Sequence, residues 1–265
     1  MNAITQRELD VLCGIAEAAG REIMAVYESG DFDATRKDDE SPLTAADLRA
    51  DAVIRAGLER AFPGVFILSE ESRSAAHATL PSAFLLVDPL DGTKEFLKRN
   101  GEFTVNIAVV RDGVPIAGVV QAPALGELFY GAKGVGAWKR TNGAPQAIHV
   151  SACEPTQPLR VLGSRSHGSD AMERWLDALG REHQFLAAGS SLKFLRIAEG
   201  AADAYPRMGP TSQWDTAAGQ AVLEAAGGAV HDPVGQPLRY GLDRPILNPN
   251  FLATGDPRLA LPPIT

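Results

Sequence analysis

An apolar run at residues 85–87, Leu-Leu-Val, ends in two carboxylates that stand three residues apart, Asp88 and Asp91. Gly92 and Thr93 follow directly. Apolar runs of this length are typical of buried strands. Two like charges at the end of such a strand are costly unless a cation lies beside them. The stretch therefore predicts a buried strand with a metal site at its end.

Helical and strand patterns surround this strand in the first half of the chain. Apolar residues recur at helical spacing from Ile4 to Glu28, and a second helical pattern runs from the stretch TAAD to Phe62. Asp112-Gly113 lies between two apolar runs and predicts a hairpin. Short strand patterns occupy residues 65–69, 84–88, 103–110 and 115–122, and two more lie within 126–139. We expect residues 1–150 to form an N-terminal α+β domain, with two helices packed on a mostly antiparallel sheet.

From residue 151 onward, strands and helices alternate more regularly. Strand patterns at 159–164, 184–189 and 202–207 are interleaved with helical patterns at 170–179 and 192–199, and a further helix begins near Trp214. We expect this C-terminal α/β domain, residues 151–265, to be a second layered unit. The Pro-rich tail at 261–265 is expected to be peripheral.

The composition limits the class of protein. Hydrophobic residues make up 45% of the 265 residues and charged residues 22%, as in soluble globular proteins. A formal net charge of −8 argues against a nucleic acid polymer as partner, because that needs a basic face. No apolar run is long enough to cross a membrane, and the first residues lack the pattern of a signal peptide. We expect a cytoplasmic protein, with peripheral association with the inner membrane left open. Cys13 and Cys153 have no spacing for zinc or for a disulfide framework.

Carboxylates recur at four places where a purely structural role explains them poorly. They are Asp47, Glu70 with Glu71, Asp88 with Asp91, and Asp215. Each has an ordinary explanation as well: Asp47 can complete a capping box, Asp215 can cap a helix, the Glu pair can be solvated, and 88–93 can be a turn. A single cause covers all four, since an all-oxygen ligand set favours Mg²⁺ or Mn²⁺. Several carboxylates around two or more such ions are typical of metal-assisted phosphoryl transfer to water.

The segments SEES, DPLDGTKEF and WDTAAG, in this order, resemble the signature segments of the inositol monophosphatase and fructose-bisphosphatase superfamily of Mg²⁺-dependent, lithium-sensitive phosphatases. SPLTAAD, SRSH, GSSLKF and YPRMGPTSQWDTAAG are similar to the CysQ-type branch, the 3′(2′),5′-bisphosphate nucleotidases. The similarity extends over most of the chain. It implies an α+β fold, the layered α-β-α-β-α sandwich of that superfamily. It also implies hydrolysis of adenosine 3′,5′-bisphosphate to AMP and phosphate, with 3′-phosphoadenylyl sulfate as a related substrate, in sulfur assimilation.

The resemblance implies roles for the acidic residues and for the helix that follows them. Glu70, Asp88 and the Leu90 carbonyl would bind one Mg²⁺ ion, Asp88, Asp91 and Asp215 a second, and Asp47 with Glu70 a third through water. Mn²⁺ is a possible substitute. The Thr93 hydroxyl, paired with Asp47, would deprotonate the attacking water. The backbone N–H groups of Gly92 and Thr93 would receive the phosphate, since a helix N-terminus favours anions.

Cations in the second half are candidates for a second phosphate. Arg165 and His167 follow one strand pattern, Arg207 ends another, and a helix begins with Ser190, Ser191 and Lys193. Arg offers a bidentate fork and Lys a point charge to a phosphate. Individually, Lys193 and Arg207 can equally be surface charges, and His167 is more often a loop histidine than a contact. As a set, they resemble the nucleoside and 5′-phosphate contacts of the bisphosphate nucleotidases.

Three other functions are weighed against this one. Haloacid dehalogenase-like phosphatases also carry a stretch like LDGT, but their nucleophilic Asp would have to stand at Pro89, which has no carboxylate. An inositol monophosphatase-like activity uses the same metal core. A metal or nucleotide sensor without catalysis would have no need of the Thr93–Asp47 pair. The oligomeric state is not predicted.

Overall fold

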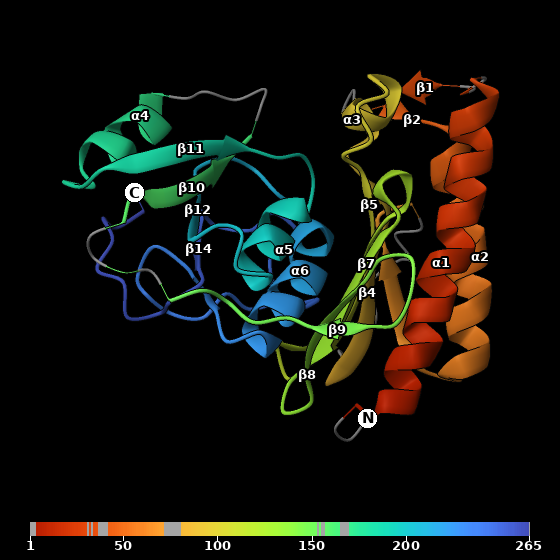
Figure 1. Ribbon diagram of the computed structural model, residues 1–265. Helices are drawn as coiled ribbons and strands as arrows, with labels where there is room; N and C mark the ends of the chain where they lie inside the picture. The colour runs from red at the N-terminus through yellow and green to blue at the C-terminus, as the bar shows by residue number, and fades with distance from the viewer. Residues whose placement is uncertain are drawn as a thin grey trace.

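The computed structural model describes residues 4–30, 32, 34–36, 42–71, 81–152, 154, 157–164 and 170–264. Its helices and sheets form five successive layers (Figure 1). Two N-terminal helices form the first layer and a seven-stranded sheet the second. Two further helices lie between this sheet and a five-stranded sheet, and a last helix covers the outer side. The predicted α+β class and the α-β-α-β-α layering are confirmed.

The first layer consists of α1 (Gln6–Ser29) and α2 (Ala45–Ala61). Both helices begin with a capping box, made by Thr5 with Glu8 in α1 and by Thr44 with Asp47 in α2. Their apolar faces pack on each other and on the seven-stranded sheet. A short antiparallel pair precedes α2: β1 (Thr35–Arg36) and β2 (Pro42–Leu43). The cap at Thr44 matters for the site, because it sets where Asp47 lies.

The seven-stranded sheet follows the order of the chain. Its strands are β3 (Phe66–Ser69), β4 (Ala83–Asp91), β5 (Thr104–Arg111), β6 (Val114–Ala122), β7 (Glu127–Ala132), β8 (Gly136–Arg140) and β9 (Gln146–Ala147). β3 pairs with β4 in parallel, and the other neighbours in this sheet are antiparallel. Asp112 and Gly113, with φ of 51° and 77°, form the predicted hairpin turn. A 3₁₀ turn, η1 (Pro123–Leu125), links β6 to β7.

The five-stranded sheet has the order β11-β10-β12-β14-β13. Its strands are β10 (Leu159–Gly163), β11 (His183–Ala187), β12 (Ala204–Arg207), β13 (Ala229–His231) and β14 (Phe251–Thr254). β10 pairs in parallel with β11 and β12, whereas β14 is antiparallel to β12 and β13. The strands β13 and β14 were not predicted. The division into two domains at residue 150 stays a prediction.

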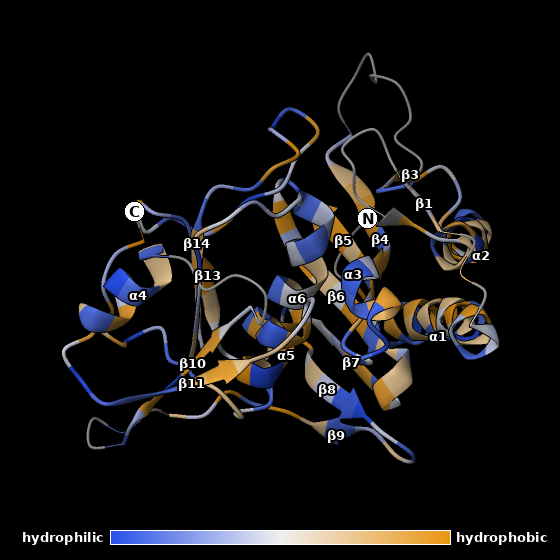
Figure 2. Cartoon of the chain, turned by 90° about the horizontal axis from the view of Figure 1, so that it is seen from above, coloured by the Kyte–Doolittle hydropathy of each residue, from blue (hydrophilic) through white to orange (hydrophobic). Residues whose placement is uncertain are grey.

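The central layer holds α5 (Leu192–Ala198) and α6 (Gln213–Ala225), and α4 (Asp170–Asp177) lies on the outer side. Viewed from above, α1 and α2 lie on one side of the first sheet and α5 and α6 on the other (Figure 2). A Cβ on Gly118 of β6 would lie 2.3 Å from the Ala218 carbonyl oxygen, so this glycine lets α6 lie directly on the strand. As a result, the first turn of α6 lies close to the end of β4.

The end of the C-terminal tail and Cys13 are both buried in apolar surroundings. Ile264 is buried against Leu159 and Trp175, and the Trp175 indole N–H donates to the Pro262 carbonyl (3.0 Å). The expectation of a peripheral tail is therefore wrong, because these apolar side chains complete a small core. Burial raises the pKa of the Cys13 thiol to about 12, and Cys153 lies outside the described residues. None of the described helices is both long and apolar enough to span a membrane.

Candidate active site

The carboxyl end of β4 carries the first part of the candidate site. Asp88 is 1% exposed, and its Oδ1 accepts a hydrogen bond from the Leu90 backbone N–H (3.1 Å). The pairing with β5 shifts register between Asp88 and Asp91, so the strand is irregular around Pro89. Gly92 follows with a φ of 90°, which favours glycine, and opens the short helix α3 (Thr93–Leu97). Residues 88–93 therefore contain both the turn and the two carboxylates, Asp88 and Asp91.

Asp47 and Thr93 come together across 46 residues of sequence. Thr93 Oγ1 lies 3.4 Å from Asp47 Oδ1 and 3.3 Å from the Leu90 carbonyl oxygen. The other oxygen, Asp47 Oδ2, accepts hydrogen bonds from the backbone N–H and the hydroxyl of Thr44, at 2.7 and 2.6 Å. The capping role and the contact with Thr93 thus use different oxygens of one buried carboxylate.

Asp215 lies in the first turn of α6, where its Oδ2 accepts a hydrogen bond from the Ser212 backbone N–H (2.8 Å). Ser191, at the start of α5, connects this turn to β4. Its Oγ lies 2.7 Å from the Asp215 carbonyl oxygen and 3.0 Å from Asp91 Oδ2. The same Oγ accepts a hydrogen bond from Asn106 Nδ2 (2.9 Å). One buried hydroxyl therefore joins carboxylate-bearing elements from different layers.

The carboxylates of the site repel one another. Burial raises the pKa of Asp88 well above its usual range, and the charges of Glu70, Asp91, Asp215 and Asp47 raise it further. Burial also raises the pKa of Asp91 and of Asp215. Glu70 directly follows β3, the parallel neighbour of β4. No three His, Cys, Asp or Glu side chains in the described ranges are arranged to hold a metal ion as they stand. The fit to a hard cation rests instead on the all-oxygen donors and on the repulsion that a cation would relieve.

Lys193 and Arg207 are the described cations of the predicted substrate set. Lys193 is 6% exposed, and its Nζ donates to two carbonyl oxygens, of which that of Ser190 is the closer at 2.7 Å. Burial lowers the pKa of Lys193 to about 8, although the charge of Asp91 opposes this shift. Arg207 Nη2 donates to the Pro210 carbonyl (3.0 Å), but Arg207 Nε is buried and has no hydrogen-bond partner among the described residues. A buried N–H without a partner suits a bound anion.

A cavity of about 160 Å³ brings part of the predicted site together. Its lining includes Asp91, Gly92, Ser190, Lys193, Arg207 and Asp215. The other described site residues do not line it, namely Asp47, Glu70, Asp88, Leu90 and Thr93. A neighbouring cavity of about 420 Å³ shares Tyr205 and Arg207 and adds Met172 and Met208. Arg165 and His167 lie outside the described residues, although Ser164 lines both cavities.

Ser190 is held very close to the turn after β4. Its φ is 46°, and its Oγ lies 2.9 Å from the Asp91 carbonyl oxygen and 2.8 Å from that of Glu102. A Cβ on Gly92 would lie 2.1 Å from Ser190 Oγ, so only glycine leaves room for this contact. Glu102 Oε2 in turn accepts a hydrogen bond from the Gly189 backbone N–H (2.9 Å). The Ser190 hydroxyl thus binds protein carbonyls as well as lining the cavity.

Asn106 and Glu102 belong to the site and were not identified from the sequence. Asn106 carried a signal, because it is a polar residue inside the apolar run FTVNIAVV. Ser191 was a candidate on the substrate side, and the structure places its hydroxyl on Asp91 and on the Asp215 carbonyl instead. Glu102 lies in a loop, where a carboxylate is ordinary.

Comparisons with known proteins place the chain in a family. Residues 5–260 match the inositol monophosphatase family, and the chain belongs to it. The 3′(2′),5′-bisphosphate nucleotidase CysQ of Salmonella typhimurium is 49% identical over 93% of this chain and 99% of its own length. CysQ of Escherichia coli K12 is also 49% identical, over 92% and 98%. The expected family is thereby confirmed.

Solved structures agree with this placement. CysQ from Bacteroides thetaiotaomicron, a bacterial member of the inositol monophosphatase family, has a TM-score of 0.82 and 36% identity, and the match covers 96% of this chain and 99% of that one. An inositol monophosphatase from Anabaena sp. PCC 7120 has a TM-score of 0.74 and 29% identity, over 95% and 91%.

Proposed function

We propose that this protein is a 3′(2′),5′-bisphosphate nucleotidase, a Mg²⁺-dependent phosphomonoesterase that hydrolyses adenosine 3′,5′-bisphosphate to AMP and phosphate. 3′-Phosphoadenylyl sulfate is a related substrate, and sulfur assimilation is the setting. The observation that carries the proposal is 49% identity to two CysQ relatives across nearly the whole length of the chains. The site is consistent with it, since Lys193 and Arg207 line one cavity with Asp91 and Asp215. This pairing suits a substrate with two phosphates.

Inositol monophosphatase family members depend on metal ions, generally Mg²⁺. We assign one ion to Glu70, Asp88 and the Leu90 carbonyl, a second to Asp88, Asp91 and Asp215, and a third, looser one to Asp47 with Glu70. Mn²⁺ is expected to substitute. The support is chemical: all donors are oxygens, and the carboxylates are buried close enough to raise the pKa of Asp88. When bound, such ions neutralise a phosphate and lower the pKa of a water molecule.

Asp47 and Thr93 are assigned the proton transfer. Thr93 Oγ1 faces Asp47 Oδ1 at 3.4 Å, so the hydroxyl can pass its proton to the carboxylate while it takes one from the attacking water. Thr44 holds the second oxygen of Asp47 and keeps the carboxylate oriented. The N–H groups of Gly92 and Thr93 receive the phosphate. Thr93→Ala should lower kcat by about 10²–10⁴-fold, with a smaller change in KM, whereas Thr93→Ser should keep most of the activity.

The phosphate that is not cleaved is assigned to Lys193, Arg207 and Ser190. Lys193 has three donors and gives two of them to carbonyl oxygens, which leaves one for a ligand. Arg207 Nε is buried without a partner in the described part of the chain. Arg165 and His167 belong to the same assignment, although they lie outside the described residues.

Turnover with Mg²⁺ on adenosine 3′,5′-bisphosphate, adenosine 3′-monophosphate and inositol 1-phosphate tests the function. The bisphosphate should have the highest kcat/KM. A preference for inositol 1-phosphate would instead make the protein an inositol monophosphatase-like enzyme. Binding of nucleotide and Mg²⁺ without turnover of any ester would make it a sensor. The proposal includes a cytoplasmic location, which cell fractionation tests.

A further inference from the structure

A third cavity, of about 480 Å³, lies at the C-terminal half of α6, whereas Asp215 lies in the first turn. Its walls come from α6, the start of β6, the turn between β7 and β8, β13, and residues 237–239. Among the described residues it shares no lining residue with the cavity of the candidate active site. Its volume lies within the range of about 300–1,000 Å³ that is typical of small-molecule sites. The proposed function uses none of its residues.

This cavity has apolar walls and a cationic rim. Ala221, Ala225 and Leu238 contribute apolar surface. Lys133 and Arg239 line the same cavity, and both are exposed. Neither side chain has a hydrogen-bond or ion-pair partner in the part of the chain that the structure describes. Two cations are therefore available beside an apolar wall, in a chain whose net charge is −8.

One carboxylate, Glu224, lines the cavity beside these cations. It is half-buried, and its Oε1 accepts a hydrogen bond from Gln220 Nε2 (2.7 Å). Burial raises the pKa of Glu224, while the hydrogen bond with Gln220 and the charges of Lys133 and Arg239 oppose the rise. Both cations are therefore within electrostatic reach of one point in the cavity. The lining thus holds two cationic side chains and one carboxylate, so positive charge is in excess there.

We propose that this cavity is a second ligand site, for a small organic anion with an apolar body. The anionic group binds Lys133 and Arg239, and the apolar body lies against α6. Charged hydrogen bonds to the two cations would orient the ligand, and removal of its apolar surface from water would supply affinity. The site goes beyond the proposed reaction, because its residues lie apart from those assigned to catalysis.

Hydrogen bonds connect the wall of this cavity to the first turn of α6. Tyr240 OH lies 2.6 Å from Gln220 Oε1 and 3.0 Å from Thr216 Oγ1. Gln220, Tyr240 and Thr216 are all buried, and Thr216 lines the candidate active site. A ligand that moves Glu224 would therefore act, through Gln220, on the turn that carries Asp215.

The binding test uses 1-anilinonaphthalene-8-sulfonate, an apolar anion, with the full chain, followed by fluorescence and calorimetry. One molecule should bind per chain. Lys133→Glu and Arg239→Glu should each weaken binding by about tenfold or more, the scale of a lost charged hydrogen bond. Arg21→Glu is the matched control, because Arg21 is an exposed cation on α1, on the other face of the seven-stranded sheet, and it should change nothing.

A second probe isolates the charge. N-Phenyl-1-naphthylamine lacks the sulfonate, so its weaker binding should be the same in all these variants. Equal binding of the sulfonate by wild type, Lys133→Glu and Arg239→Glu would overturn the proposal, as would absence of saturable binding. Loss of binding in Arg207→Ala, with retention in the two charge reversals, would place the probe in the candidate active site and would also overturn it.

Hydrogen exchange tests the connection along α6. The sulfonate probe should slow exchange of the amides at 212–216 in wild type and leave them unchanged in Tyr240→Phe, which keeps the ring and removes the linking oxygen. Probe binding by Tyr240→Phe itself shows that the variant is folded. Equal protection in both proteins would reject the connection. None of these measurements needs substrate turnover, so a failure here is distinct from a failure of the proposed reaction.

Discussion

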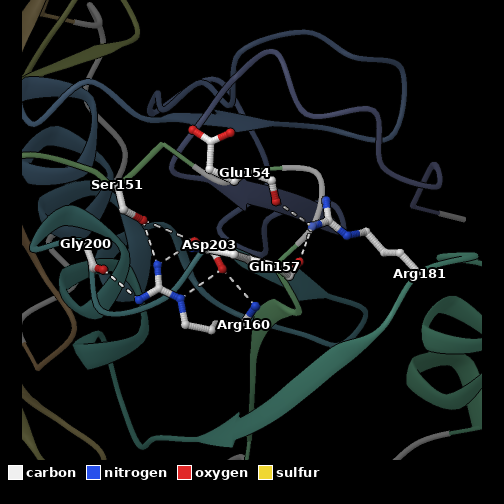
Figure 3. Close-up of polar contacts among 7 residues, drawn as sticks. All are labelled: Ser151, Glu154, Gln157, Arg160, Arg181, Gly200 and Asp203. Carbon is white, nitrogen blue, oxygen red and sulfur yellow. Dashed lines mark hydrogen bonds and ion pairs between the residues drawn. The ribbon is translucent and has the colours of Figure 1, made fainter.

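Buried carboxylates occur in two regions of this molecule under opposite electrostatic conditions. Asp203, just before β12, is held by Arg160 of β10, with Nη2 2.7 Å from Oδ1 and Nε 3.0 Å from Oδ2 (Figure 3). Burial alone would raise the pKa of Asp203, but the hydrogen bonds and charge of Arg160 outweigh it and hold this pKa below its usual value. Asp88 is also buried and Asp215 is half-buried, but carboxylates are prominent among their neighbours, and their pKa values are raised.

Asp203 therefore has a structural role, whereas Asp88 and Asp215 are available for chemistry. Two further N–H groups of Arg160 donate to Ser151 Oγ at 2.7 Å and to the Gly200 carbonyl at 2.9 Å (Figure 3). The charge of the Asp203 carboxylate is thus balanced by Arg160, within the chain. Around Asp88, charges of the same sign accumulate and add to the cost of burial. The second region is the one that a cation from solution would stabilise.

The largest expected effect comes from removing a charge in the acidic region. Asp91→Asn and Asp215→Asn should each lower kcat by a few orders of magnitude, because each removes a carboxylate that we assign to a metal ion, and such a ligand is worth several kcal/mol in the transition state. Steady-state kinetics at saturating Mg²⁺ measures this. Asp203→Asn is the control: it should destabilise the fold and leave kcat nearly unchanged at 25 °C. An Asp91→Asn enzyme with more than about a tenth of wild-type kcat would remove the distinction between the two regions.

The cations across the cavity should have a smaller and more selective effect. Lys193→Met and Arg207→Ala should each cost about 1.5–3 kcal/mol in kcat/KM on adenosine 3′,5′-bisphosphate, the scale of a lost charged hydrogen bond. On adenosine 3′-monophosphate the same variants should change little. Because the pKa of Lys193 is about 8, its positive charge is present below that pH and lost above it. KM for the bisphosphate should therefore rise above about pH 8 in wild type but not in Lys193→Met.

Equal losses of kcat/KM on mono- and bisphosphates would contradict this assignment. Such a result would mean that Lys193 and Arg207 support the fold of the site rather than the second phosphate. The melting temperature of each variant distinguishes a general loss of structure from a loss of binding.

The two regions should respond to pH with opposite sign. The folded pKa of Asp203 is lowered, so its contribution to the free energy of unfolding is complete above its ordinary value and is lost as pH falls through the lowered one. The pKa values of Asp88 and Asp215 are raised, so their contribution is present below the ordinary value and is lost as pH rises through the raised ones. In EDTA, stability should therefore decline on the alkaline side of about pH 4, and Mg²⁺ should remove that decline.

Urea unfolding with EDTA or Mg²⁺ across pH 3–8 measures these contributions. Asp88→Asn should flatten the decline in EDTA. Asp203→Asn should cost about 1–3 kcal/mol at neutral pH, a modest value because Arg160 is 32% exposed. A stability profile in EDTA that rises steadily with pH, and is the same in Asp88→Asn, would show that the acidic region is not under strain.

The acidic region around Asp88, Asp91 and Asp215 could be predicted from the sequence. Its residues stand in short contiguous stretches at the end of β4 and in the first turn of α6. The local pattern of each stretch sets its position. The Arg160–Asp203 pair could not be predicted, since 43 residues separate the partners and only the order of β10 and β12 brings them together. The same holds for the fold. The long helices and the Asp112-Gly113 hairpin follow from local patterns, whereas β13 and β14, of three and four residues, depend on pairing with distant strands.

The smallest effect concerns Ser191, which connects the acidic region to the second half of the chain. Its Oγ lies 3.0 Å from Asp91 Oδ2, so we expect it to orient a carboxylate that is assigned to a metal ion. Mg²⁺ should raise the melting temperature, and the Mg²⁺ concentration that gives half of this increase is the midpoint. Ser191→Ala should raise the midpoint by about tenfold, the lower end of the loss in metal affinity seen when a residue that orients a metal ligand is replaced. The increase at saturating Mg²⁺ should stay the same.

Ser151→Ala is the matched control, because Ser151 Oγ lies 3.2 Å from Asp203 Oδ1 and so contacts the carboxylate that already has a cation. It should lower the melting temperature and leave the Mg²⁺ midpoint unchanged. An equal shift of the midpoint in both variants would mean that loss of any buried hydroxyl weakens Mg²⁺ binding through the fold as a whole. No shift in Ser191→Ala would limit Ser191 to holding β4 against α6. Each of the two serines contacts a carboxylate, but among the described residues only Asp203 has an arginine partner, Arg160. A shift of the midpoint in Ser191→Ala alone would therefore show that the orientation of Asp91 affects Mg²⁺ binding.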